Sequence, residues 1–91
     1  MAFEWDLWNV QKNELKQGVS AIEAKSAFHD PKYKLFNDRR HSDRENRFIL
    51  LGRTLENRIL MVGFTLRANK VRVITARPAS KNERSVYEKR K

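Results

Sequence analysis

The sequence predicts a small α+β domain in which helices pack on an antiparallel sheet. Helix starts are predicted by a serine followed three residues later by a glutamate, first at Ser20 and again at Ser80, because this spacing forms a reciprocal capping box. Runs of branched and aromatic residues joined by short polar connections predict an antiparallel meander of strands. These runs occupy residues 46–53, 58–66 and 70–76. Helices grouped around such a meander make an α+β domain.

The N-terminal segment predicts a strand followed by a helix. Residues 3–5 (Phe-Glu-Trp) alternate in polarity and predict a short strand. Asp6 is expected to cap a helix over residues 7–17. Gly18 is expected to end that helix, since glycine adopts the left-handed conformation without a steric penalty.

A second helix is expected to begin after Ser20 and to end before Pro31, which cannot continue it. Glu23 would complete its capping box by bonding back to the backbone of Ser20. An apolar stripe at helical spacing would face the core. Its members are Ile22, Ala24, Ala27 and Phe28.

The remaining elements follow from alternation and capping. Residues 32–36 alternate and predict an edge strand, whereas 58–66 are apolar at nearly every position, so both faces of that strand are expected to be covered. The capping box of Ser80 and Glu83 opens a helix over residues 81–89. Ninety-one residues fit a single domain spanning 1–91.

Composition indicates a basic cytoplasmic protein. The 91 residues contain no cysteine, which suits a reducing compartment. The N-terminus lacks the layout of a secretion signal, and the longest apolar run, 59–66, is far below the ~18 residues that span a bilayer. The formal net charge is +9, and such a field attracts polyanions, nucleic acid first among them. A solvated basic surface and an acidic protein partner are the alternatives.

A predicted hairpin between residues 58–66 and 70–76 locates part of this positive charge. If Ala68-Asn69 form a two-residue loop, Arg67 faces Lys70, Thr65 faces Arg72, and Gly63 faces Ile74. Alternation then puts Thr65, Arg67, Lys70 and Arg72 on one face of the sheet. The other face would be core, with Val62, Phe64, Leu66, Val71 and Val73. Converging cations beside a glycine suit a phosphate backbone, although a charged tip kept for solubility gives the same pattern. Alternation does not decide whether Arg77 joins this face.

Other site chemistry is sparse. The histidines, His29 and His41, have no neighbours at metal-ligand spacing, so no metal or other cofactor is expected. His29 fits a helix-end cation. His41 lies in a polar loop among cations, where it can contact phosphate or simply be solvated. No helix combines a recognition pattern with a dimerisation surface, which argues against a stand-alone DNA-binding protein.

An ordered set of short motifs closely resembles the BrnT family of toxins from type II toxin–antitoxin systems. The set extends over nearly the whole chain, with spacings that match the family. It comprises FEWD at 3–6, K-Q-G-V-S at 16–20, FHDP at 28–31, HS at 41–42, E-x-R at 45–47, FT-x-R at 64–67, RVITAR at 72–77 and ER-x-x-Y at 83–87.

The resemblance implies a RelE-like fold and a metal-independent endoribonuclease that arrests growth. It further implies a BrnA-like antitoxin with a ribbon-helix-helix part, and contact with operator DNA only through the complex with that antitoxin. In such a reaction the 2′-hydroxyl attacks the adjacent phosphorus, so a base, an acid and stabilising cations are needed.

Roles can be assigned on this basis. The phosphate-binding candidates are Arg67, Lys70, Arg72 and His41, and the catalytic candidates are Lys16, Gln17, Thr75, Arg77 and Tyr87. Gln17 stands where the family commonly has histidine, and glutamine cannot carry a proton. Either the working residues are elsewhere, or the protein is a weakened toxin that acts mainly as an antitoxin-binding co-repressor.

Overall fold

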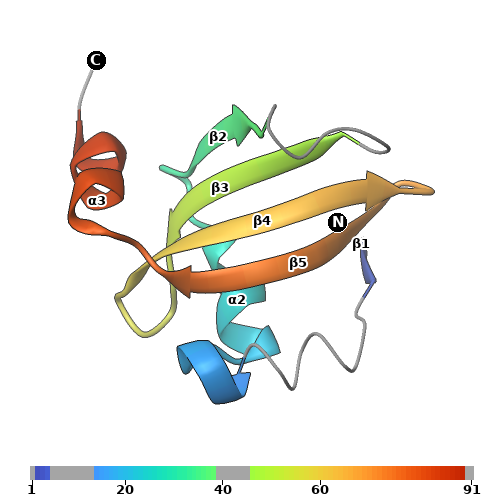
Figure 1. Ribbon diagram of the computed structural model, residues 1–91, viewed down its shortest axis with the longest axis horizontal. Coiled ribbons are helices and arrows are strands. Elements are labelled where there is room, and N and C mark those ends of the chain that lie inside the picture. The colour runs from blue at the N-terminus through green and yellow to red at the C-terminus, as the bar shows by residue number, and fades with distance from the viewer. Residues whose placement is uncertain (1, 5–13, 39–45, 90–91) are drawn as a thin grey trace.

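The computed structural model describes residues 2–4, 14–38 and 46–89 (Figure 1). Five strands form one sheet in the order β1-β5-β4-β3-β2. The strands are β1 (Ala2–Glu4), β2 (Lys34–Asn37), β3 (Arg47–Arg53), β4 (Ile59–Arg67) and β5 (Lys70–Pro78). Helix α2 (Ala21–Ala27) precedes β2, and helix α3 (Lys81–Glu88) follows β5. The α+β class is confirmed.

Strands β2 to β5 form the predicted antiparallel meander, but β1 pairs with β5 in parallel. The sheet is therefore mixed, and the expectation of a wholly antiparallel sheet is wrong at this edge. Pairing between the first and last strands joins segments far apart in the sequence, so no turn between them signals its direction.

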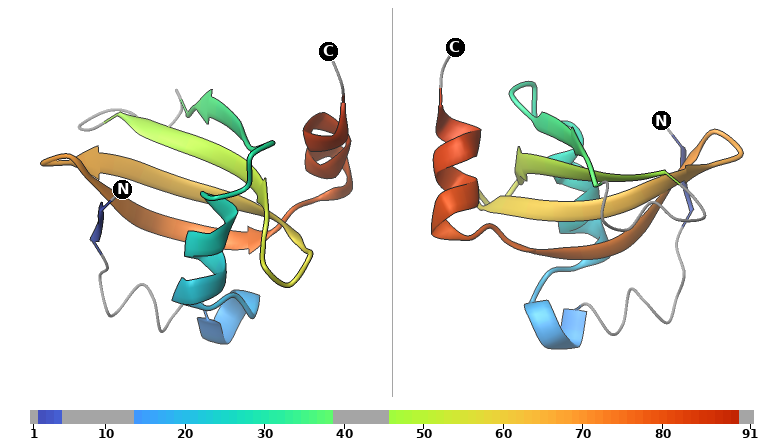
Figure 2. Two further views of the ribbon diagram at one scale, coloured as in Figure 1. Left: turned by 180° about the vertical axis from the view of Figure 1, so that it is seen from behind. Right: turned by 45° about the horizontal axis from the view of Figure 1, so that its top comes forward.

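Helix α2 covers one face of the sheet (Figure 2). Ala24, Ala27 and Phe28 are buried against β-strand residues of the main core cluster, as the stripe predicts. Ile22 is the exception, because 77% of its surface is exposed. Four consecutive residues of β4, Ile59–Val62, are buried, which agrees with the expectation that both faces of this strand are covered.

Both predicted helix boundaries at glycine and serine are observed. Residues 14–17 are helical, and Gly18 follows with φ of +66° while its N–H donates to the Glu14 carbonyl at 3.0 Å. The rest of the helix expected over 7–17 lies outside the described residues. Around Ser80 the complete reciprocal capping box forms with Glu83.

The capping box at Ser20 forms only in part. The Ser20 hydroxyl accepts from the Glu23 N–H at 3.1 Å. The Glu23 carboxylate does not return to the Ser20 backbone, because it accepts hydrogen bonds from Thr54 and Arg58. Glu23 is buried, and a buried carboxylate needs a cationic partner more than a helix terminus needs a second bond.

Gly52 permits the close approach of α2 to β3. A Cβ at this position would overlap the carbonyl oxygen of Ala27 and would stand 3.0 Å from Leu50 Cδ2. Backbone cannot swing aside as a side chain can, so Gly52→Ala is expected to destabilise the protein by about 2 kcal/mol through overpacking. The urea midpoint at neutral pH measures this. In Gly18→Ala no atom of the described residues lies within 4 Å of the new Cβ, and φ is +66°, so this variant measures the strain of a positive φ apart from overpacking.

Candidate functional site

A β-bulge in β5 decides which side chains share a face with the cations. Phe64 pairs with Val73, whereas Gly63 pairs with Thr75, so Ile74 is the extra residue. The expected pairing of Gly63 with Ile74 is therefore wrong, because a bulge adds one residue to one strand. Beyond the bulge the alternation reverses.

The reversal brings Thr75 and Arg77 onto the face opposite α2. In β5, Arg72 lies opposite Thr65, Thr75 opposite Gly63, and Arg77 opposite Met61. Ala76 instead joins the buried core on the α2 side. We call the face opposite α2 the basic face, and its cations on the three central strands are Arg47, Arg53, Arg67, Lys70, Arg72 and Arg77. The predicted grouping of Thr65, Arg67, Lys70 and Arg72 is confirmed.

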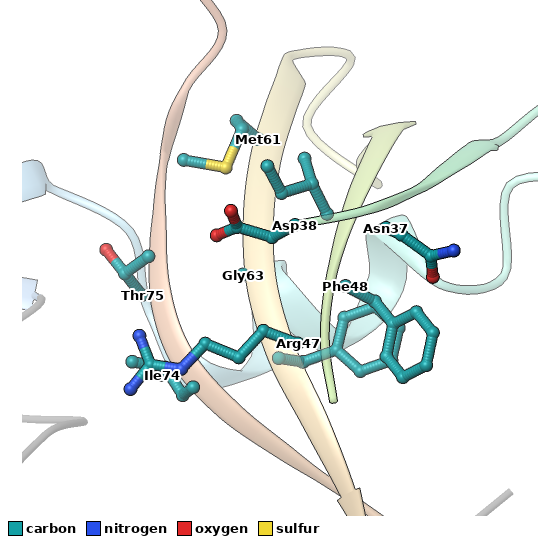
Figure 3. A pocket seen from close by; sticks show the side chains of 10 residues that line it. Asn37, Asp38, Arg47, Phe48, Met61, Gly63, Ile74 and Thr75 are labelled. Atoms are coloured by element: carbon teal, nitrogen blue, oxygen red, sulfur yellow. The ribbon is translucent and has the colours of Figure 1, made fainter. Parts of the chain in front are cut away.

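A hollow of about 610 Å³ opens on the basic face over Gly63. Its lining includes the apolar residues Ile49, Met61 and Ile74 and the polar residues Asn37, Asp38, Arg47 and Thr75. In Figure 3 the Asp38 carboxylate and the Arg47 guanidinium both extend across β4, passing on either side of Gly63. The site thus has an apolar floor and a charged rim.

The two ends of the hollow differ. Toward the β4–β5 hairpin, Arg67 and Lys70 are exposed and Arg72 is half-buried. Thr65 lies between them and the hollow, 1% exposed, and its hydroxyl oxygen has no hydrogen-bond partner among the residues that the structure describes. Toward α3, the floor is closed by a second apolar cluster of Leu51, Ile59, Met61 and Tyr87.

Arg77 is held by α3. Its Nη1 donates to Glu83 Oε1 and its Nη2 to Glu83 Oε2, both at 2.8 Å, which is the bidentate geometry of a guanidinium–carboxylate pair. Burial alone would raise the pKa of Glu83, but the hydrogen bonds from Arg77 and the Ser80 backbone hold it below its ordinary value. Arg77 is therefore held in place on the basic face, and two of its guanidinium N–H donors are already bonded to Glu83.

Tyr87 anchors α3 to the loop that follows α2. Its hydroxyl donates to Asp30 Oδ2, which also accepts from the Arg53 N–H at 2.7 Å. Burial and the bond to Asp30 raise the pKa of Tyr87 above its ordinary value. Burial would raise the pKa of Asp30 as well, but the bonds from Tyr87 and two backbone N–H groups lower it. The Tyr87 proton is therefore committed to a structural bond.

Tyr87→Phe is expected to destabilise the protein by about 2 kcal/mol, because the ionised Asp30 loses a charge-assisted hydrogen bond while the ring still packs. Urea denaturation at pH 7 measures the loss. Tyr33→Phe, which removes an exposed hydroxyl, is the matched control. An unchanged urea midpoint in Tyr87→Phe would contradict this role.

The remaining predicted residues lie elsewhere or outside the described chain. Lys16 and Gln17 end the short helical segment that leads into α2 (Figures 1 and 2). The nearby Val19 packs into the core on the α2 side of the sheet. Lys16 and Gln17 therefore lie on the opposite side of the sheet from Thr75 and Arg77. His41 lies outside the described residues.

The polar residues of the hollow that received no role from the sequence are Asn37, Asp38 and Arg47, although Arg47 belongs to the E-x-R motif at 45–47. Arg47 lies opposite Thr65, and the Asp38 N–H donates to the Arg47 carbonyl at 2.8 Å. A signal existed for Arg47: it precedes an apolar strand run and, by alternation from Thr65, belongs on the basic face. Asp38 follows an edge strand whose register only the fold reveals.

Within the described ranges, no group of three His, Cys, Asp or Glu side chains is placed to hold a metal ion. No helix in the same part of the chain is long and apolar enough to cross a membrane. In the described ranges the hollow is lined by Arg47, the Asp38 carboxylate, the Thr75 hydroxyl and the Asn37 amide, and the Glu4 carboxylate of β1 is in register with Arg72 on the same face.

Comparisons with known proteins identify the family and the fold. The fold is α+β, a five-stranded mixed sheet with helices packed on it, and is consistent with the expected RelE-like fold. The family model described as the ribonuclease toxin BrnT of type II toxin–antitoxin systems matches residues 5–83. The chain therefore belongs to the BrnT family of ribonuclease toxins. The family assignment also implies an antitoxin partner.

The structure is similar to the crystal structure of the Brucella abortus ribonuclease toxin BrnT. The TM-score is 0.66 at 23% sequence identity, over 89% of this chain and 99% of that chain. At this identity the likeness establishes the shared fold. No curated protein matches the sequence significantly.

Proposed function

We propose that this protein is a metal-independent endoribonuclease that cleaves RNA on its basic face and thereby inhibits translation and growth. The observation that carries the proposal is the β5 bulge, which aligns Arg72, Thr75 and Arg77 on one face beside the hollow over Gly63. Guanidinium groups bind phosphate through paired hydrogen bonds, and residues of one strand face repeat about every 6.6 Å. A phosphodiester over Gly63 would have cations on both sides.

The chemistry of such a site follows from its groups. Without a metal, the 2′-hydroxyl of the RNA loses its proton to a base and attacks the adjacent 3′-phosphorus, and the bond from phosphorus to the 5′-oxygen of the next nucleotide breaks as that oxygen takes a proton from an acid. Arg72 and Arg77 stabilise the negative charge that develops on the phosphorane. The Thr75 hydroxyl donates a hydrogen bond to a phosphate oxygen, and Arg67 and Lys70 hold the neighbouring backbone.

We further propose a cytoplasmic toxin neutralised by a BrnA-like antitoxin of the ribbon-helix-helix type, which alone would bring the complex to operator DNA. The net charge of +9 supports an RNA substrate and also an antitoxin segment rich in acidic residues.

The test is cleavage of a labelled RNA by pure protein in excess chelator. Products ending in a 2′,3′-cyclic phosphate are expected from the native protein. The double variant Arg72→Ala with Arg77→Ala should leave the RNA intact. Intact RNA at high native protein concentration, with or without added metal ions, would reject the ribonuclease proposal, and cleavage that needs an added metal ion would reject metal independence.

A second candidate is a weakened toxin that serves mainly as an antitoxin-binding co-repressor. It is favoured by Gln17, which cannot carry a proton, and by the commitment of Arg77 to Glu83 and of Tyr87 to Asp30. Expression of the native chain alone, beside Gln17→His at matched levels, separates the two. Growth arrest by the native chain supports the toxin, whereas arrest by Gln17→His alone supports the co-repressor.

A further inference from the structure

We propose that the hollow over Gly63 binds one unstacked guanine base of the RNA, with Asp38 and Arg47 reading its Watson–Crick edge. This inference rests on the proposed function for its substrate class, and it adds the base that the same site selects. Two charged side chains that line the hollow, Asp38 after β2 and Arg47 at the start of β3, motivate it.

The shape of the hollow suits a flat ring. Its volume of about 610 Å³ lies within the range of small-molecule sites, which are mostly apolar with a few placed polar groups. Gly63 leaves the sheet surface bare at its centre, and even a methyl group there would stand 3.1 Å from Thr75 Cγ2. Ile49, Met61 and Ile74 surround this point. Single-stranded RNA is read through bases that are splayed out against such surfaces.

The polar groups indicate which base. A carboxylate only accepts hydrogen bonds and a guanidinium only donates them. Guanine presents two adjacent donors, N1–H and N2–H, beside the acceptor O6. Asp38 can accept from both donors while Arg47 donates to O6. Cytosine and adenine offer a carboxylate one amino group, and uracil offers one N–H between two acceptors, so guanine alone engages both side chains fully.

The placement of the pair fits the proposed path of the backbone. Asp38 and Arg47 are cross-strand neighbours, joined by a backbone hydrogen bond of 2.8 Å, and both extend across β4 in Figure 3. Thr75 forms the opposite wall of the hollow, and Arg72 and Arg77 flank it along β5. A nucleotide can therefore set its base over Gly63, within reach of the Asp38 and Arg47 side chains, while its phosphate contacts β5.

The experiment uses five-nucleotide 2′-O-methyl RNAs of sequence UUXUU with X as G, A, C or U, which bind but cannot be cleaved. Fluorescence anisotropy with the native protein should show roughly tenfold tighter binding for G, as expected of a bidentate contact to a base. Asp38→Asn should bind all four with similar affinity, because an amide cannot accept from both donors. Glu88→Gln, an exposed carboxylate on α3, should keep the preference.

Equal binding of the four oligonucleotides by the native protein would overturn the guanine site, and so would a preference that persists in Asp38→Asn. These outcomes are distinct from failure of the proposed function. If the protein prefers G in this assay but leaves ordinary RNA intact, the proposed base site stands and the proposed ribonuclease activity is rejected. If the protein cuts RNA but binds the four oligonucleotides equally, the ribonuclease proposal stands and the base site is rejected.

Discussion

Arg77→Ala is expected to slow RNA cleavage by about 100- to 1,000-fold, the effect of removing one preorganised donor from a developing oxyanion. The bulge puts this guanidinium on the face of the hollow, two residues from Thr75. Glu83 fixes its orientation before RNA arrives, which saves the entropy of ordering a long side chain. The measurement is the initial rate with a fluorophore–quencher RNA in chelator, beside the urea midpoint of the same sample.

Glu83→Gln is the matched control, because it removes the charge that Arg77 faces but keeps an oxygen that can accept from the Ser80 N–H. A purely structural Arg77–Glu83 pair predicts the same loss of cleavage in both variants. A phosphate-binding Arg77 predicts that Glu83→Gln keeps most of the activity. Cleavage by Arg77→Ala within about threefold of the native rate would remove Arg77 from the site.

Local signals in the sequence predicted the elements well because their causes are local. The Ser80–Glu83 box, the Gly18 stop and the Ala68-Asn69 loop each depend on residues within one turn. Ala68 and Asn69 both have positive φ, as a two-residue hairpin of this kind requires. The pairing of Arg67 with Lys70 and of Thr65 with Arg72 followed from that loop alone.

The candidate site was predicted only in part because its register depends on the whole sheet. Near the hairpin the loop fixes the pairing, so Arg67 and Arg72 were placed correctly. Farther along, the bulge at Ile74 shifts every later residue by one. An unbroken strand would bury Arg77 and expose Ala76, so burying Ala76 in the core favours the bulge. The hollow also needs β2 and β3, and no local pattern in the sequence joins Asp38 to Gly63.

The buried Glu23 illustrates the same limit and leads to the largest expected effect on stability. Its local motif indicated a bond to the Ser20 backbone, but its carboxylate accepts from the Nε and Nη2 of Arg58, more than thirty residues away in sequence. Arg58 also donates to the Gly18 carbonyl at 3.0 Å. The pair thereby ties the start of α2 to the turn between β3 and β4.

Arg58→Ala is expected to reduce the free energy of unfolding by about 3 kcal/mol at pH 7, because it leaves an unpaired carboxylate in the protein interior. The estimate is at the lower end for buried pairs, since 37% of the Arg58 side chain is exposed. Stability of the native domain is itself only about 5–15 kcal/mol, so the urea midpoint should fall markedly. The double variant Glu23→Gln with Arg58→Ala should recover part of the loss, because no buried charge remains.

The same pair predicts a pH dependence of known sign. Hydrogen bonds from Arg58, opposed by burial and aided by Thr54, hold the pKa of Glu23 below its ordinary value of 4.5. A carboxyl with a lowered folded-state pKa stabilises the protein above its unfolded-state pKa, and the contribution is lost as pH falls through the folded-state value. The stability difference between native and Arg58→Ala should therefore be largest near pH 7 and shrink below pH 4.5. A difference that stays constant down to pH 3 would mean that Arg58 acts by packing rather than by charge.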